Sequence, residues 1–242
     1  MSFTSFTTDD SVISSDAIIA PMWTGDLTTL STFFTSSAQE SSTPGNFYLD
    51  VYQSNPNSSG AEVQFSIAYG HISGSGSAYF NIFTQDKTPT RDIYGQFRSL
   101  IYGDENTPFT FGSSTSTTKD IIVISINRAR FKESFNPGSI SLILSGSGNN
   151  ILTLTDDSTV STTTTYIGSS RVYQLLSGSY NSVYSSSYTI SGSYGFMIPD
   201  EGLIVLNPRA LSLPTGSGTL GGLSMSFNEY SSSQVTTANP GY

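Results

Sequence analysis

The stretch KDIIVISINRARFKESFNPGSISLILSG, residues 119–146, decides how the rest of the chain is organised. Residues 121–126 are apolar except for Ser125 and rich in β-branched side chains, which is typical of a short strand buried on both faces. Residues 140–144 predict a second strand, and Asn136-Pro137-Gly138 is a strong turn signal just before it. We therefore expect a β-domain built around the 121–126 strand.

A basic segment lies between these two predicted strands. Residues 127–132, NRARFK, hold three of the nine basic residues of the chain. If the backbone stays extended here, Arg128 and Arg130 lie on one face, Lys132 joins them, and Phe131 points to the core. The pattern predicts an assembly contact made by Arg128, Arg130 and Lys132.

The distribution of charge supports that hypothesis. The formal net charge is −9, yet seven of the nine basic residues fall between Lys87 and Lys132. An acidic chain is a poor generic nucleic-acid binder, because phosphate binding needs a basic face. Acidic turns at 156–157 and 200–201 of a neighbouring copy are possible partners for the basic segment. Plain solvation or local pairing of the basic residues is an equally open alternative.

The flanking sequence predicts more strands and one helix. Residues 47–69 alternate apolar and polar side chains and predict a β-hairpin. In the stretch 89–102, apolar residues recur at helical spacing, Thr90 can cap the helix, and Gly103 can end it. Further strands are predicted at 151–155, 171–176, 194–198 and 202–206, and a short helix after Asn207-Pro208. We expect a mainly-β fold, an antiparallel β-sandwich or barrel-like domain with one short packed helix at about 90–102.

Composition and patterning suggest three parts. Residues 1–20 are polar and predict an N-terminal arm, and the Gly/Ser-rich residues 212–242 predict a tail, both ordered only against neighbours. Residues 21–211 predict the β-rich structural domain, either as one unit or as two subdomains that meet near 147–170. The Ser/Tyr-rich segment 177–193 predicts an exposed excursion.

The sequence offers little for catalysis. The chain has no cysteine and a single histidine, His71, which lies in the Gly/Ser-rich loop predicted at 70–77. No nucleophile motif accompanies it, so we expect a solvated loop histidine. We predict that the chain is not an enzyme and takes no cofactor, metal or small-molecule substrate. No apolar run is long enough for a membrane helix, and MSFTSFTTDD lacks the basic and apolar regions of a secretory signal.

The order of several segments resembles a known group of proteins. The segments are FFTSS (33–37), FYLDVY (47–52), AEVQFSIAYGH (61–71), GSGS (74–77), TRDIYGQFRSL (90–100), ISINRARFKE (124–133), NPG (136–138), YGF (194–196) and GLIVLN (202–207). The chain is similar over about residues 30–211 to virion structural proteins of tailed phages, particularly those of T-even-like myoviruses of marine cyanobacteria. The Gly/Ser-rich tail departs from that group.

The resemblance implies a component of the virion, made in the host cytoplasm, with no catalytic residues to carry over. The expected partners are other virion proteins and copies of this chain, with no nucleic acid and no membrane. The resemblance does not distinguish head, neck, tail and baseplate. The alternative function is a carbohydrate- or receptor-binding β-module of a phage fibre or host-recognition device, suggested by the tyrosines and hydroxyl side chains of 177–193.

Overall fold

A computed structural model describes most of the chain. The described residues are 23–25, 27–36, 48–73, 89–112, 117–131, 133–145 and 151–211. The predicted arm at 1–20 and the predicted tail at 212–242 lie outside them, and so does Lys132.

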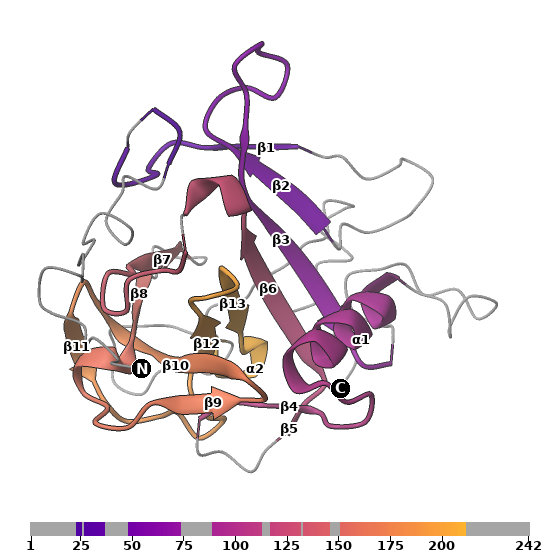
Figure 1. The fold of residues 1–242 in the computed structure, drawn as a ribbon, viewed down its shortest axis with the longest axis vertical. Coiled ribbons are helices and arrows are strands. Elements are labelled where there is room, and N and C mark those ends of the chain that lie inside the picture. The colour runs from indigo at the N-terminus through magenta and orange to yellow at the C-terminus, as the bar shows by residue number, and fades with distance from the viewer. Residues whose placement is uncertain are drawn as a thin grey trace, which may run out of the picture.

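The described strands form a large curled antiparallel sheet, which confirms the predicted mainly-β fold (Figure 1). Along the sheet the order is β1-β2-β3-β6-β13-β12-β10-β8-β7, with β9 and β11 also paired to β10, while β4 and β5 pair with each other. The strands are β1 (Phe34–Ser36), β2 (Tyr48–Tyr52), β3 (Val63–His71), β4 (Phe109–Thr110), β5 (Thr117–Thr118), β6 (Asp120–Ile126), β7 (Leu142–Ser145), β8 (Ile151–Asp156), β9 (Thr165–Ile167), β10 (Ser170–Ser179), β11 (Ser182–Ser185), β12 (Gly195–Ile198) and β13 (Leu203–Leu206).

Strand β6 is central, as its apolar sequence predicted. It pairs with β3 on one side and β13 on the other, and all of its residues except Ser125 are buried. Its alternate side chains enter two separate cores. Ile122, Ile124 and Ile126 join the core on one face of the sheet, whereas Ile121 and Val123 join the core on the other. A strand covered on both faces therefore organises both layers of the domain.

The second strand predicted in the opening stretch exists, but it does not pair with β6. It is β7, which begins two residues later than expected, pairs with β8 and ends the sheet. The turn before it is confirmed, because Ser139 N–H donates to the carbonyl of Asn136 at 3.1 Å and Gly138 has φ +88°. The intervening segment crosses from the middle of the sheet to its end.

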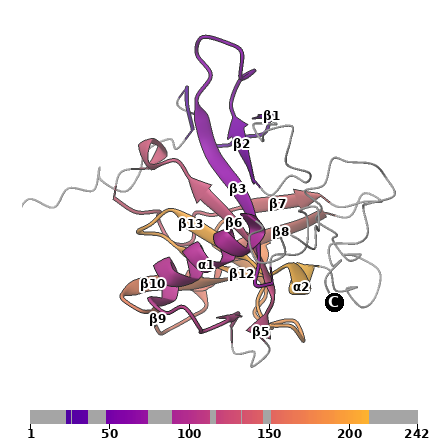
Figure 2. The same cartoon turned by 90° about the vertical axis from the view of Figure 1, so that its right-hand side faces the viewer.

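Helix α1 (Pro89–Tyr102) packs against β3 on one face of the sheet (Figures 1 and 2). Gly70 permits this approach, because a Cβ there would lie 2.8 Å from the backbone nitrogen of Tyr94. The Tyr94 hydroxyl donates to the carbonyl of Thr118 at 3.0 Å and accepts from the N–H of Phe109 at 3.1 Å. The prediction that Thr90 caps the helix is wrong, since the helix begins at Pro89 and Thr90 is buried inside it.

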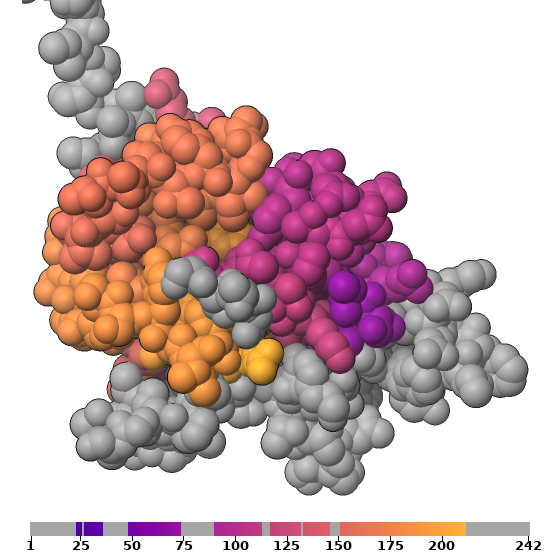
Figure 3. Space-filling model, turned by 90° about the horizontal axis from the view of Figure 1, so that it is seen from below, coloured from indigo at the N-terminus to yellow at the C-terminus, as the bar shows by residue number. Residues whose placement is uncertain are grey.

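Two hairpins of the sheet follow the predicted positions. The β2–β3 hairpin projects beyond the rest of the sheet (Figure 2), and β12 pairs with β13 through a tight turn. Helix α2 (Pro208–Leu211) begins after Asn207, whose side-chain carbonyl accepts from the N–H of Ala210 at 3.3 Å. Figure 3 shows the surface of α1 beside that of the C-terminal strands.

Candidate assembly site

The predicted basic row does not continue as a strand. Arg128–Arg130 form a 3-10 helix, η3, because the Asn127 side chain accepts the N–H of Ala129 at 3.0 Å and so closes a turn at once. The prediction that Arg128 and Arg130 share one face of an extended segment is therefore wrong. Phe131 leaves η3 in an extended conformation, packs against the core and contacts the ring of Phe135 at 4.8 Å between centroids.

Arg130 makes contacts within the domain rather than presenting its charge at the surface. Its guanidinium lies 3.0 Å from the carboxylate of Glu62, and its side chain is only 16% exposed. It also donates to the hydroxyl of Thr24, whose N–H and hydroxyl both contact Gln64. Arg130 thus joins η3 to the start of β3 and to the segment near Trp23. This contact has no local sequence signal, because Glu62 and Thr24 are distant from Arg130 along the chain.

Arg128 remains at the surface. Its guanidinium donates to the carbonyl of Phe131 at 2.6 Å and lies 4.6 Å from the centre of the Phe131 ring. The residue is exposed, so its charge faces solvent while the ring holds the side chain in place. Of the predicted contact residues that the structure describes, Arg128 is the one that keeps an accessible charge.

The acidic turns proposed as partners for the basic row also have intramolecular roles. Asp200 accepts two hydrogen bonds from Arg171, at 2.6 and 3.1 Å. Asp156 is fully buried, and its carboxylate accepts the N–H groups of Gly138 and Ser158. Next to it, burial is the main cause of the raised pKa of Asp157. Asp156 therefore holds the turn before β7 and presents no free carboxylate to a neighbouring copy.

His71 is not a solvated loop residue, contrary to the prediction. Strand β3 extends to His71, which pairs with Asp120 in register and is 2% exposed. Its Nδ1 accepts the N–H of Ser73 at 3.1 Å. Burial, assisted by the positive charge of Lys119, lowers the pKa of His71 to about 4. The imidazole is therefore neutral near pH 7, with its proton on Nε2.

The two ends of the sheet expose apolar side chains. Among the described residues, no strand pairs with the outer edge of β1 or of β7. Phe34 on β1 is 40% exposed and Ile143 on β7 is 62% exposed. Neither strand contains a charged residue or a proline. The sequence predicted a strand at 140–144, which corresponds to β7, but it did not predict that β1 and β7 end the sheet, since strand order depends on contacts distant in the chain.

The segment 177–193 forms a second exposed feature. Strand β11 continues from β10 through Tyr180 and Asn181, which both have positive φ, 33° and 55°. Tyr180 and Tyr184 are largely exposed on this hairpin, and Ile190 follows it at the surface. A tyrosine with positive φ is uncommon, so the turn holds Tyr180 in a costly conformation.

Within the described ranges, no helix is long and apolar enough to cross a membrane. In the same part of the chain, no group of three His, Cys, Asp or Glu side chains is placed to hold a metal ion. No protein-family model, no curated protein and no solved structure matches the chain.

Proposed function

We propose that this chain is a structural component of a phage virion, in its tail, neck, baseplate or head, acting through protein–protein assembly contacts. Its partners are other virion proteins and copies of itself. The observation that carries the proposal is the pair of exposed apolar sheet ends, Phe34 on β1 and Ile143 on β7. The segment resemblance described above supplies the virion context.

Edge strands of this composition are more typical of a protein that assembles with other chains than of a monomer. Monomeric proteins usually protect their edge strands with lysine, proline, bulges or a covering element, or by keeping the strands very short, and β1 and β7 use only the last of these among the described residues. Strands β1 and β7 carry none of these residues and add exposed apolar side chains instead. When β1 of one copy meets β7 of the next, the contact is heterologous and repeats head to tail, which generates a ring or a filament.

The small size of these edges limits the affinity of one contact. Strand β1 has three residues and β7 has four. A stable pairwise interface buries about 1,200–2,000 Å², which so short an edge does not reach alone. We therefore expect a weak contact in dilute solution that becomes strong when several contacts form together on a particle.

The basic segment contributes a second, polar part of the contact. Arg128 presents an accessible guanidinium, and Lys132 follows it in the sequence, whereas Arg130 is paired with Glu62. Exposed single ion pairs add only about 0–1 kcal/mol, so this part sets orientation more than affinity. The proposed protein is not an enzyme and binds no cofactor, nucleic acid or membrane.

Localisation in a purified particle tests the proposal. A tag placed on the chain should be found by cryo-electron microscopy at symmetry-related positions of the particle, with β1 or β7 in contact with a neighbour. Particles that contain no copy of the chain, or that hold it with both sheet ends in solvent, would contradict the proposal.

The exposed β10–β11 hairpin favours a second candidate, a receptor- or carbohydrate-binding module. Tyr180 and Tyr184 provide flat amphipathic rings at the surface, and such rings are common where proteins contact ligands. Under this hypothesis, replacing Tyr184 by Ala abolishes binding to host cells or glycans, while assembly is unaffected. An unchanged binding profile for Tyr184→Ala would eliminate the hairpin as the receptor site.

A further inference from the structure

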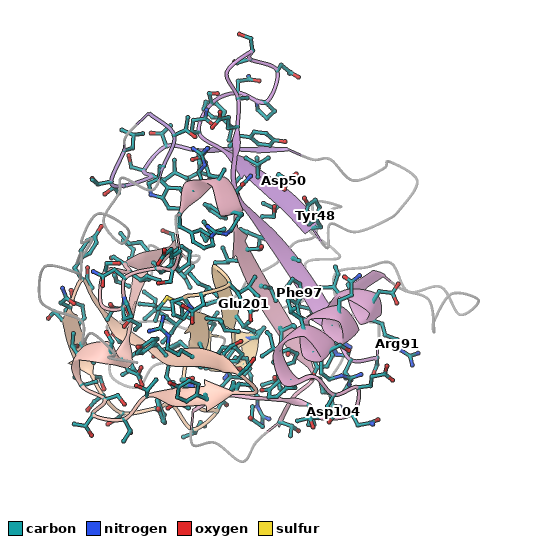
Figure 4. All side chains as sticks on the ribbon, viewed as in Figure 1. Tyr48, Asp50, Arg91, Phe97, Asp104 and Glu201 are labelled. Carbon is teal, nitrogen blue, oxygen red and sulfur yellow. The ribbon has the colours of Figure 1, made fainter. Side chains whose placement is uncertain are left out.

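A carboxylate is fixed in a defined orientation on the β2–β3 hairpin. Asp50 Oδ1 accepts one hydrogen bond from the hydroxyl of Tyr48 and one from the hydroxyl of Ser66, each at 2.5 Å. Figure 4 shows Tyr48 and Asp50 side by side along β2. Burial and the hydrogen bond to Asp50 raise the pKa of Tyr48, so its phenol keeps the proton that it donates. Two donors therefore hold one oxygen of this carboxylate in place.

The sheet register extends this carboxylate into a polar row. Asp50 on β2 lies opposite Ser66 on β3, and Ser66 lies opposite Ser125 on β6. Residues directly opposite each other share a face, with Cβ atoms about 4.5–5.5 Å apart. All three side chains are partly exposed. We call Asp50, Ser66 and Ser125 the Asp50 row.

The row keeps hydrogen-bonding capacity for a ligand. Within the part of the chain that the structure describes, Asp50 Oδ2 accepts no hydrogen bond and no Lys or Arg forms an ion pair with Asp50. The Ser125 hydroxyl likewise makes no hydrogen bond to a described residue. An ionised carboxylate oxygen accepts from a ligand, and a serine hydroxyl both donates and accepts.

Aromatic side chains flank the row on both sides. Tyr48 and Tyr52 lie two residues before and after Asp50 on β2, so all three point to the same face. Phe34 on β1 lies opposite Tyr52. The distance from Tyr48 to Tyr52 along the strand is about 13 Å, at roughly 3.3 Å per residue. The surface is thus a strip of hydroxyl and carboxylate groups between partly exposed rings.

We infer that the Asp50 row binds a saccharide. A sugar offers neighbouring hydroxyl groups, which donate to Asp50 Oδ2 and exchange hydrogen bonds with Ser125. Ser66 accepts from the sugar, because its own proton is donated to Asp50. Its apolar C–H face packs on the rings of Tyr48 or Tyr52, which supply contact area at little cost in side-chain entropy. A cationic ligand would need the carboxylate but would leave the serine hydroxyls unmatched, and a phosphate-bearing ligand would be repelled by Asp50.

Asp50 is already held in place before a ligand binds, which lowers the entropic cost of binding. Because Tyr48 and Ser66 already orient the carboxylate, binding does not have to order it. The strip is open rather than enclosed, so one site binds weakly, and repeated copies on a particle raise the overall avidity. The inference does not rest on the proposed assembly role. The site also lies far from the β10–β11 hairpin, at the other end of the sheet (Figure 1).

A glycan array followed by nuclear magnetic resonance tests the inference. The array carries bacterial O-antigen and capsular oligosaccharides together with glucan, mannan and chitin fragments. The oligosaccharide with the strongest signal is then titrated into the ¹⁵N-labelled wild-type protein. We expect amide shifts concentrated at 48–52, 65–67 and 124–126. Asp50→Asn and Ser125→Val should each weaken binding roughly tenfold or more. Val160→Lys is the control and should bind like the wild type, because Val160 is exposed and lies outside the strands.

Other outcomes overturn the inference. These are an array with no selective binding, shifts that map away from the Asp50 row, or binding lost in Tyr184→Ala and kept in Asp50→Asn. Stronger binding to lysine-rich peptides than to any glycan would also overturn it. If Asp50→Asn fails to fold, the wild-type shift map decides alone. Particle localisation tests assembly separately, so either hypothesis can fail without the other.

Discussion

The ring of Phe131 lies directly over Gly202. A Cβ at Gly202 would sit 2.5 Å from both Cε1 and Cζ of Phe131, and Gly202 has φ +70°. Phe131 therefore packs on the turn between β12 and β13. In the same turn, the carbonyl of Gly202 accepts the N–H of Ile126 at 2.9 Å. The glycine provides both the left-handed backbone and the space for the ring.

Replacing Gly202 by Ala should therefore destabilise the domain on two counts. The left-handed conformation costs about 1–2 kcal/mol for a residue with a Cβ, and displacing Phe131 costs about 1–3 kcal/mol more. Gly103→Ala is the matched control, because Gly103 has φ +66° with no atom within 4 Å of the added Cβ. Urea unfolding should show a clearly larger loss for Gly202→Ala, and equal losses would contradict the packing argument.

The buried carboxylate of Asp156 gives a second prediction. Asp156→Ala leaves the N–H groups of Gly138 and Ser158 without their acceptor inside the domain. We expect a loss of about 2–4 kcal/mol in the free energy of unfolding, because each unsatisfied buried donor is costly. Asp104→Ala is the control. Asp104 accepts two backbone N–H groups at the surface, where water replaces it, so its loss should be much smaller. Comparable thermal shifts in both variants would refute the difference.

The sequence predicted those helices and strands whose conformation is specified by their own residues. Local signals specify the conformation of three elements: the apolar residues 121–126 of β6, interrupted only by Ser125, the helical spacing of α1, and the Asn207-Pro208 start of α2. The pairing of those elements was not predictable in the same way. Strand β7 follows β6 along the chain but lies at the end of the sheet, because its partner is β8.

The local geometry of the basic segment was predicted wrongly for physical reasons of the same kind. The Asn127 side chain competes with the extended backbone and folds Arg128–Arg130 into η3. Arg130 pairs with Glu62, which lies just before β3 and is distant in the sequence, and His71 and Asp156 are buried by elements far along the chain. Residue types and spacing do not report such burial. The two rings beside Asp50 alternate visibly in the sequence, but their register with Ser66 and Ser125 does not.

The buried His71 should make stability depend on pH. Its pKa in the folded protein, about 4, is below the ordinary 6.5, so the fold disfavours the charged imidazole. The stability that comes from keeping His71 neutral is fully present above about pH 6.5. It is lost as the pH falls toward 4, and the total loss in the free energy of unfolding is at most about 3 kcal/mol. His71→Gln should flatten that part of the profile in urea titrations between pH 7.5 and 4.5. The same decline in wild type and variant would show that other groups cause it.

Charge reversal at the two arginines of η3 should show that Arg130 contributes more to the stability of the fold than Arg128. Arg130→Glu places a carboxylate beside Glu62 and removes the bond to Thr24, so we expect a loss of about 1–3 kcal/mol. Arg128→Glu changes an exposed side chain and should cost less, about 0.5–1 kcal/mol, because only the contacts with Phe131 are lost. The double variant Arg130→Glu/Glu62→Arg should recover part of the loss. No recovery in that thermodynamic cycle would indicate that the ion pair is not the cause.

The last prediction concerns the exposed sheet ends. Ile143→Lys and Phe34→Lys each place a charge on a terminal strand, and lysine on an edge opposes the addition of another strand. Because both side chains are already exposed, the fold should lose little stability, whereas self-association and incorporation into particles should fall. Val160→Lys is the control, since Val160 is 48% exposed but lies outside the strands.

Sedimentation velocity over a concentration series, together with incorporation into particles, measures this difference. Wild type and Val160→Lys should show the same concentration dependence, and the two edge variants should remain monomeric over the same range. Because the proposed contact joins β1 of one copy to β7 of another, a mixture of the two edge variants should form pairs through their intact edges but no longer chains. Edge variants that assemble like the wild type would show that the sheet ends are not the contact.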